Sequence, residues 1–328
     1  MPAEVGMNKN HTYILIFSLL VCCLFGGCKK SNSNSSRSGE VIVYTYNSFS
    51  GEWGAGPEIA RLFQEKTGIK VTYAECGDSI QILSKAILEK DNPYADVLLG
   101  LDNNMVKSVK ESGVLKSFKP SNAKVLSDGL ENELGNEWFL IPYDYSPFSI
   151  IINTDSKLPE PKCLEDLTKD IYKKKLILMN PQTSTPGLGF ETWVRTVYGS
   201  NADDYMKRLQ PSILTMAPSW SVGYGMFSNG EAPLVISYTT SPAYQVEYNE
   251  GDNFKALTFT DGHVMQVEGA GILKNCKNPE GAKKFIEFLI SEEAQKIIPV
   301  TQWMYPANAK VVLPESYNGV VMPRVIDN

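Results

Sequence analysis

The sequence is poor in the residues on which catalytic and metal sites are built. It has two histidines, His11 and His263, and six cysteines that form no CxxC or Cys/His cluster. This spacing suggests neither a zinc site nor a disulfide framework. A Gly-x-Ser-x-Gly elbow, an HExxH pair, a Walker loop and a dinucleotide-binding glycine fingerprint are also missing. We therefore expect no enzyme, no cofactor and no metal; paired carboxylates stay open, because any acidic chain contains candidates.

Basic residues form no run longer than three in the folded part of the chain. The 31 basic and 37 acidic residues give a formal net charge of −6. A protein that neutralises nucleic-acid phosphates needs a basic patch or stripe. Nucleic acid is therefore not an expected partner.

Only one apolar run stands out, from Tyr13 to Phe25. It is shorter than the ~20 residues that span a bilayer, and with Lys9 before it and small residues after it the pattern predicts a signal peptide, residues 1–27. Gly26-Gly27-Cys28 resembles a lipobox, so we expect Cys28 to be lipidated; the alternative is an ordinary secretory signal. Residues 28–40 then form a flexible tether. The predicted location is the periplasm or the outer face of the cell membrane, with a lipid anchor and no membrane span.

The rest of the chain alternates between strand and helix patterns. Strands are predicted at 41–46, 69–74 and 96–100, with a helix from Pro57 to Gly68 and another after Asp78. This βαβαβ opening predicts a mostly parallel, doubly wound sheet. Similar elements follow between 148 and 291, so we expect two α/β lobes. The first lobe comprises 41–143 and 262–328, and the second comprises 144–261.

Ligands of open parallel sheets bind beyond the carboxyl ends of the strands. In the first lobe these ends are followed by residues 46–53, 77–79 and 102–104, which are polar or aromatic. Residues 183–187, Thr-Ser-Thr-Pro-Gly, begin a predicted helix with hydroxyls and free N–H groups at its positive pole. No Lys or Arg is near, so this motif predicts either a neutral donor cradle or a plain capped helix.

Six segments carry a family resemblance across almost the whole mature chain. They are Tyr44–Phe49 with Trp53-Gly54, Ala95–Asn104, Thr183–Gly189, Trp220-Ser221, Ser237–Tyr244 and Trp303–Pro306. In this order they resemble the periplasmic thiamine-binding proteins of the type II solute-binding fold. The resemblance implies two lobes that close on thiamine, or on its mono- or diphosphate, and a monomer that delivers it to an ABC permease.

The resemblance also implies roles for individual residues. It places Trp220 and Tyr244 against the pyrimidine with Tyr46 nearby, and Ser184 beside the hydroxyl or phosphate with Tyr238 and Trp303. Relatives have an acidic residue before the glycine at Gly77, where this chain has Cys76, so Asp78 either supplies that carboxylate or only caps its helix. The full predicted ligand-binding set is Tyr46, Trp53, Gly77, Asp78, Ser184, Thr185, Gly187, Trp220, Tyr238, Tyr244 and Trp303.

Two other cationic solutes suit the same fold. Ferric-iron relatives use adjacent tyrosines, whereas Tyr238 and Tyr244 are six residues apart. Polyamine relatives combine aromatic rings with carboxylates, which Asp78, Asp102 and Asp144 could provide. A polyamine-binding or iron-binding protein is therefore the alternative to a thiamine-binding protein.

Overall fold

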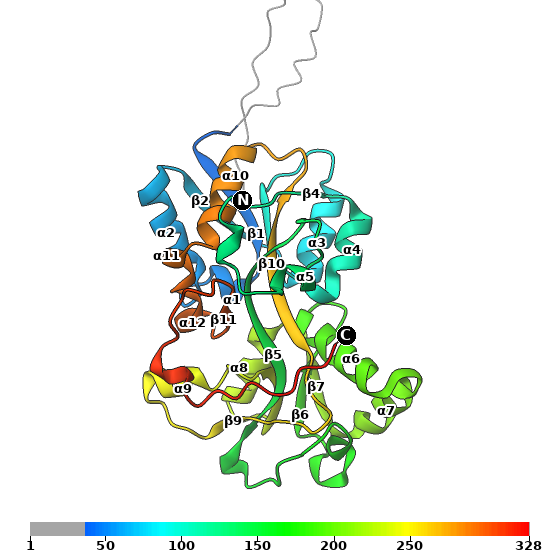
Figure 1. Cartoon of the computed structure of the whole chain (residues 1–328). Helices are drawn as coiled ribbons and strands as arrows, with labels where there is room; N and C mark the ends of the chain where they lie inside the picture. The colour runs from blue at the N-terminus through cyan, green and yellow to red at the C-terminus, as the bar shows by residue number, and fades with distance from the viewer. Residues whose placement is uncertain (1–36, 328) are drawn as a thin grey trace, which may run out of the picture. The chain divides into compact units, whose positions relative to one another are not determined.

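The computed structural model describes residues 37–327, which form a mixed α/β fold (Figure 1). The predicted signal peptide, Cys28 and most of the tether lie outside the described residues. The strands are β1 (Glu40–Thr45), β2 (Lys70–Glu75), β3 (Val97–Asp102), β4 (Leu115–Lys116), β5 (Ile141–Asn153), β6 (Leu176–Met179), β7 (Ile213–Ala217), β8 (Leu234–Tyr238), β9 (Phe254–Ala256), β10 (Met265–Leu273) and β11 (Tyr305–Pro306). The α-helices are α1 (Asn47–Ser50), α2 (Gly56–Thr67), α3 (Ser79–Leu88), α4 (Val106–Ser112), α5 (Leu130–Glu133), α6 (Thr185–Tyr198), α7 (Ala202–Leu209), α8 (Trp220–Ser228), α9 (Ala243–Tyr248), α10 (Pro279–Leu289), α11 (Glu292–Gln295) and α12 (Ile298–Thr301).

Local signals set the ends of the helices that matter for the site. α2 has Pro57 in its first turn and ends at Gly68, whose φ of +71° is the left-handed conformation that glycine adopts easily. α3 begins with a capping box in which Asp78 and Gln81 satisfy each other's backbone N–H groups. These signals explain why the sequence predicted both helices closely.

The sheet combines two parallel groups with a central antiparallel pair. Its strand order is β2-β1-β3-β10-β5-β8-β6-β7. β1 is parallel to β2 and β3, and β6 is parallel to β7 and β8, as the alternating pattern predicted. β10 runs antiparallel to both β3 and β5, and β5 is also antiparallel to β8 (Figure 1). The α/β fold class is confirmed, and the sheet is mixed because β5 and β10 join its two parallel groups.

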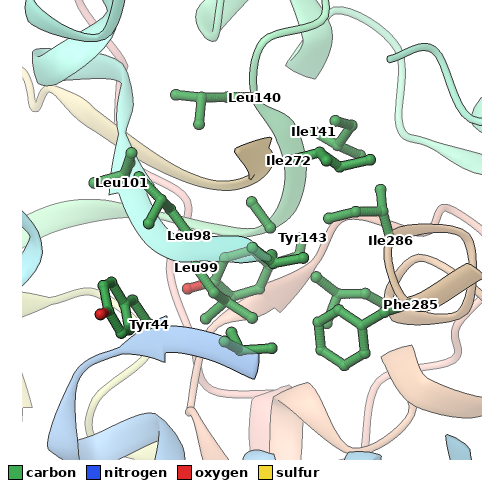
Figure 2. Packing of buried hydrophobic residues seen from close by; sticks show 14 of the residues in the cluster. Tyr44, Leu98, Leu99, Leu101, Leu140, Ile141, Tyr143, Ile272, Phe285 and Ile286 are labelled. Atoms are coloured by element: carbon green, nitrogen blue, oxygen red, sulfur yellow. The ribbon is translucent and has the colours of Figure 1, made fainter. Parts of the chain in front are cut away.

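Buried side chains form two hydrophobic clusters. The first draws its members from residues 41–143 and 267–307, and the second from residues 148–264. Figure 2 shows part of the first cluster, where side chains of β3, β5, β10 and α10 gather around Tyr143. We refer to these two hydrophobic clusters, in the order given, as the first core and the second core. The lobe boundaries that the sequence suggested stay a prediction.

Two further observations concern membranes and disulfides. Among residues 37–327, no helix combines the length and the apolar character needed to cross a bilayer. The three cysteines of this range, Cys76, Cys163 and Cys276, are all free thiols.

Candidate functional site

A pocket lies where loops of the first core meet helix starts of the second core. Its lining residues are Tyr46, Ser48, Asp78, Ser79, Thr185, Pro186, Trp220, Tyr238, Glu268, Thr301, Gln302, Trp303 and Met304. Six members of the predicted ligand-binding set are therefore brought together. The strand ends and helix starts that the sequence indicated supply most of this lining.

Asp78 holds the starts of helices from both cores together. It caps α3, and its Oδ2 accepts a hydrogen bond of 3.3 Å from the backbone N–H of Trp220, the first residue of α8. Next to it, the hydroxyls of Ser79 and Thr185 lie 3.4 Å apart. Burial raises the pKa of the Asp78 carboxyl. Asp78 thus caps its helix and also lines the pocket, and its contact with a ligand stays a prediction.

The Thr-Ser-Thr-Pro-Gly motif begins α6 as predicted. Ser184 is its N-cap residue and is fully buried, and among the described residues its hydroxyl has no hydrogen-bond partner. Thr185 and Pro186 follow it into the pocket lining. A buried hydroxyl without a partner is costly in a folded protein. Ser184 therefore places a buried hydroxyl next to the pocket lining and close to the Asp78 carboxyl, at the positive pole of a helix.

Two aromatic side chains of the second core line the pocket. Trp220 donates a 3.0 Å hydrogen bond from Nε1 to Ser237 Oγ, and its ring stacks on Tyr224 with 4.9 Å between centroids. Tyr238 donates to Gln266 Oε1 at 3.3 Å and stacks on Phe148. Stacking and hydrogen bonds fix both rings, so the pocket presents them in defined orientations.

Glu268, on β10, was not among the predicted site residues. Its Oε2 accepts hydrogen bonds from the hydroxyls of Tyr46 at 2.7 Å and Tyr143 at 2.6 Å. Its Oε1 accepts a 3.0 Å bond from Gln266 Nε2. The Tyr46 hydroxyl also accepts from Gln302 Nε2 at 3.1 Å. The sequence offered no motif or local capping signal for this residue, which lies within β10 two residues after Gln266.

Trp303 closes the lining from the segment after α12. Its backbone φ is +55°, an uncommon value for a bulky residue. Its ring packs edge-on against Tyr244 at 5.4 Å and Tyr248 at 5.9 Å, two residues of α9. Tyr244 therefore reaches the pocket through Trp303, although it is not part of the lining itself.

Besides Tyr244 and Ser184, three predicted residues lie outside the pocket lining. Trp53 is 84% exposed. Gly77 has a φ of +80°, and a Cβ there would overlap the Gln81 side chain that completes the α3 capping box. A Cβ on Gly187 would lie 2.4 Å from the Met179 carbonyl oxygen, so glycine lets α6 pack closely on β6. The two glycines thus position helix starts, and direct ligand contact by Trp53 stays a prediction.

The pocket has an acidic lining without positive charge. Asp78 and Glu268 belong to it, and none of the lining residues is Lys, Arg or His. Within residues 37–327, no group of His, Cys, Asp and Glu is arranged to hold a metal ion. The arrangement suits a flat organic cation that packs on aromatic rings.

Comparison with known proteins supports a binding role. Residues 92–323 match the family described as Bacterial extracellular solute-binding protein. The thiamine-binding periplasmic protein of Brucella abortus biovar 1 is 35% identical over 311 residues, which cover 94% of this chain and 91% of that protein. The protein of the same name from Salmonella typhimurium is 36% identical over 284 residues, covering 86% and 85%.

A solved structure shows the same arrangement of elements. A periplasmic thiamin binding protein has a TM-score of 0.82 with this chain and is 34% identical to it, and the match covers 88% of this chain and 90% of that one. The family resemblance seen in the sequence segments is thereby confirmed.

Proposed function

This chain belongs to the bacterial extracellular solute-binding proteins, and we propose that it captures thiamine in the pocket and delivers it to an ABC permease. The observation that best supports this proposal is the composition of the pocket lining. It combines two carboxyls and no basic side chain with the aromatic rings of Tyr46, Trp220, Tyr238 and Trp303. Thiamine has a flat neutral pyrimidine and a permanently cationic thiazolium ring. A desolvated cation over an aromatic face gains ~2 kcal/mol, and stacked rings add ~0.5–1.5 kcal/mol beyond burial.

The start of α6 is the proposed site for the group that extends from the thiazolium ring. Ser184 has a buried hydroxyl there, and Thr185 lines the pocket. Hydroxyls and the positive helix pole suit either the alcohol of thiamine or the phosphate of its mono- or diphosphate. We therefore propose the whole predicted set for the ligand site, with Gly77 and Gly187 acting by positioning the starts of α3 and α6.

Closure of two lobes is the proposed capture mechanism. Contacts such as Asp78 to the Trp220 amide and Ser79 to Thr185 join segments of the first and second cores around the pocket. We propose that residues 41–143 with 262–328 form one lobe and residues 144–261 the other, and that these contacts form when the lobes close. The closed monomer would be the form that the permease recognises.

Tryptophan fluorescence tests the ligand directly. Because Trp220 and Trp303 line the pocket, thiamine is expected to quench the emission at saturation. Spermidine and ferric citrate serve as parallel titrants, since neither contains a ring that can stack. A spectrum unchanged by thiamine, in protein whose folding is confirmed by circular dichroism, would overturn the assignment. A response to spermidine or iron alone would favour the other solutes.

We propose further that Cys28 carries a lipid that anchors the exported protein in the periplasm or at the outer face of the cell membrane. The support is the Gly26-Gly27-Cys28 sequence after the apolar run of the signal peptide. Two acyl chains hold a protein at a membrane without any spanning helix.

Cys28→Ser tests the anchor separately from the ligand. We expect this variant to lose incorporation of labelled palmitate and to leave the detergent phase after phase separation, because serine cannot carry the thioether-linked lipid. Thiamine affinity should not change. Cys163→Ser is the matched control, since Cys163 is a free thiol in the described part of the chain. Continued labelling of Cys28→Ser would disprove the lipid anchor.

A further inference from the structure

Three carboxyl groups lie side by side on the adjacent strands β3, β10 and β5, and one of them lines the pocket. In the sheet register Glu268 of β10 is paired with Asp102 of β3 on one side and with Asp144 of β5 on the other. Directly paired residues of adjacent strands project from the same face of a sheet. Asp102 and Asp144 are fully buried, whereas Glu268 is nearly buried and reaches the pocket lining. We call Asp102, Glu268 and Asp144 the carboxyl row.

The carboxyl row has few groups that could compensate its charge. Among the described residues, no N–H or hydroxyl group donates to either carboxyl oxygen of Asp144 or to the Oδ1 of Asp102. The Asp144 and Glu268 carboxyls lie close enough to share a hydrogen bond when one of them is protonated. None of the ion pairs in residues 37–327 includes a member of the row. The titratable side chains that face it are all acids, namely Tyr46, Asp78, Tyr143, Tyr238 and Tyr317.

Burial without a counter-charge favours the protonated form of a carboxyl. Burial raises the pKa of Asp102 to about 7. Burial and the neighbouring Glu268 carboxylate raise the pKa of Asp144 well above its usual range. The pKa of Glu268 is raised as well, chiefly by burial, although the Tyr143 and Tyr46 hydroxyls oppose this. The row therefore retains protons near neutral pH while the pocket holds no cation.

We propose that Glu268, supported by Asp144 and Asp102, is the counter-charge that selects the permanent cation of the ligand, and that the row releases a proton to solvent when the cation binds. This inference rests on the proposed function. An opposite charge within ~4–6 Å lowers a carboxyl pKa by ~1–3 units, so the thiazolium ring favours the ionised row. A neutral ring of the same shape gives no such stabilisation and leaves the proton in place.

Calorimetry of the unmodified protein measures directly how many protons are released when thiamine binds. Titrations of thiamine at pH 7 in two buffers of different ionisation enthalpy are expected to show release of up to one proton per ligand. Because burial raises the pKa values of Asp102 and Glu268 to about 7, affinity should fall about tenfold between pH 8 and pH 6. A thiamine analogue with a neutral thiophene in place of the thiazolium ring should release no proton and bind more than tenfold more weakly.

Substitutions in the carboxyl row test whether the proton released on binding comes from these residues. Glu268→Gln and Asp144→Asn should each reduce proton release and narrow the preference for thiamine over the neutral analogue by about tenfold. Glu231→Gln, at an exposed position between α8 and β8 and outside the pocket lining, is the matched control and should behave like the unmodified protein. Thiamine binding that is independent of pH and releases no proton would overturn this inference while leaving the proposed function intact. Absence of thiamine binding altogether would contradict the proposed function instead.

Discussion

Replacing Trp220 by Ala is expected to weaken thiamine binding about thirtyfold. Trp220 lines the pocket, and its ring is fixed by Tyr224 on one side and by the hydrogen bond to Ser237. The substitution removes an aromatic face from a desolvated cation and its attached pyrimidine. At ~2 kcal/mol for the lost face and 1.4 kcal/mol per decade of affinity, the dissociation constant rises by roughly a factor of thirty.

Isothermal titration of thiamine and of thiamine monophosphate checks this expectation. Both ligands should lose nearly the same affinity, because the stacked ring is common to them. Trp220→Phe keeps a smaller face and should cost only a few-fold. Tyr94→Ala, which removes a half-exposed ring near the start of β3, controls for general effects of losing an aromatic side chain. If Trp220→Ala weakens the binding of one of the two ligands much more than the other, the ligand lies in the reverse orientation.

The sequence predicted the first three strands of the sheet better than its centre. The helices α2 and α3, which lie between these strands along the chain, begin with clear local signals, so the parallel order of β1, β2 and β3 came from the βαβαβ pattern. β10 (Met265–Leu273) contains Gln266, Glu268 and two glycines, so it lacks the continuous apolar pattern of a buried strand, and the sequence predicted no strand there. Its antiparallel place between β3 and β5 depends on tertiary packing alone.

The same distinction separates the site residues that were predicted from those that were missed. Asp78, Thr185 and Trp220 stand at helix starts, where capping signals are local in the sequence. Glu268 and Gln302 have no such local signal. They belong to the site because Tyr46 brings them together, accepting from Gln302 and donating to Glu268 over more than two hundred residues of chain. Sequence patterns report local geometry, and these contacts are not local.

Trp303 is the residue whose loss should have the largest effect. It lines the pocket and also joins α9 to the segment after α12, through edge contacts with Tyr244 and Tyr248. A non-glycine residue held in an unfavourable backbone region costs ~1–3 kcal/mol and persists where its surroundings fix it. The positive φ of Trp303 is therefore maintained by these contacts, which join the pocket wall to α9.

Trp303→Ala is expected to weaken thiamine binding about a hundredfold, mainly through faster release. It removes one aromatic face, at ~2 kcal/mol, and two edge contacts at ~0.5–1.5 kcal/mol each, part of which is offset by relaxation of α9. Tyr248→Ala removes only one edge contact and leaves the lining intact, so a loss of three- to tenfold is expected. Val312→Ala, at an exposed position, is the control.

Stopped-flow release of thiamine into excess competitor distinguishes the loss of the Trp303 aromatic face from the loss of its contacts with α9. The release rate should rise in the order Val312→Ala, Tyr248→Ala, Trp303→Ala, while the association rate changes little, because differences among variants of one binding site lie mostly in dissociation. If Trp303→Ala slows association and leaves release unchanged, Trp303 guides entry and does not retain the ligand. If Tyr248→Ala equals Trp303→Ala, the contact with α9 holds the ligand, and the indole face itself contributes little.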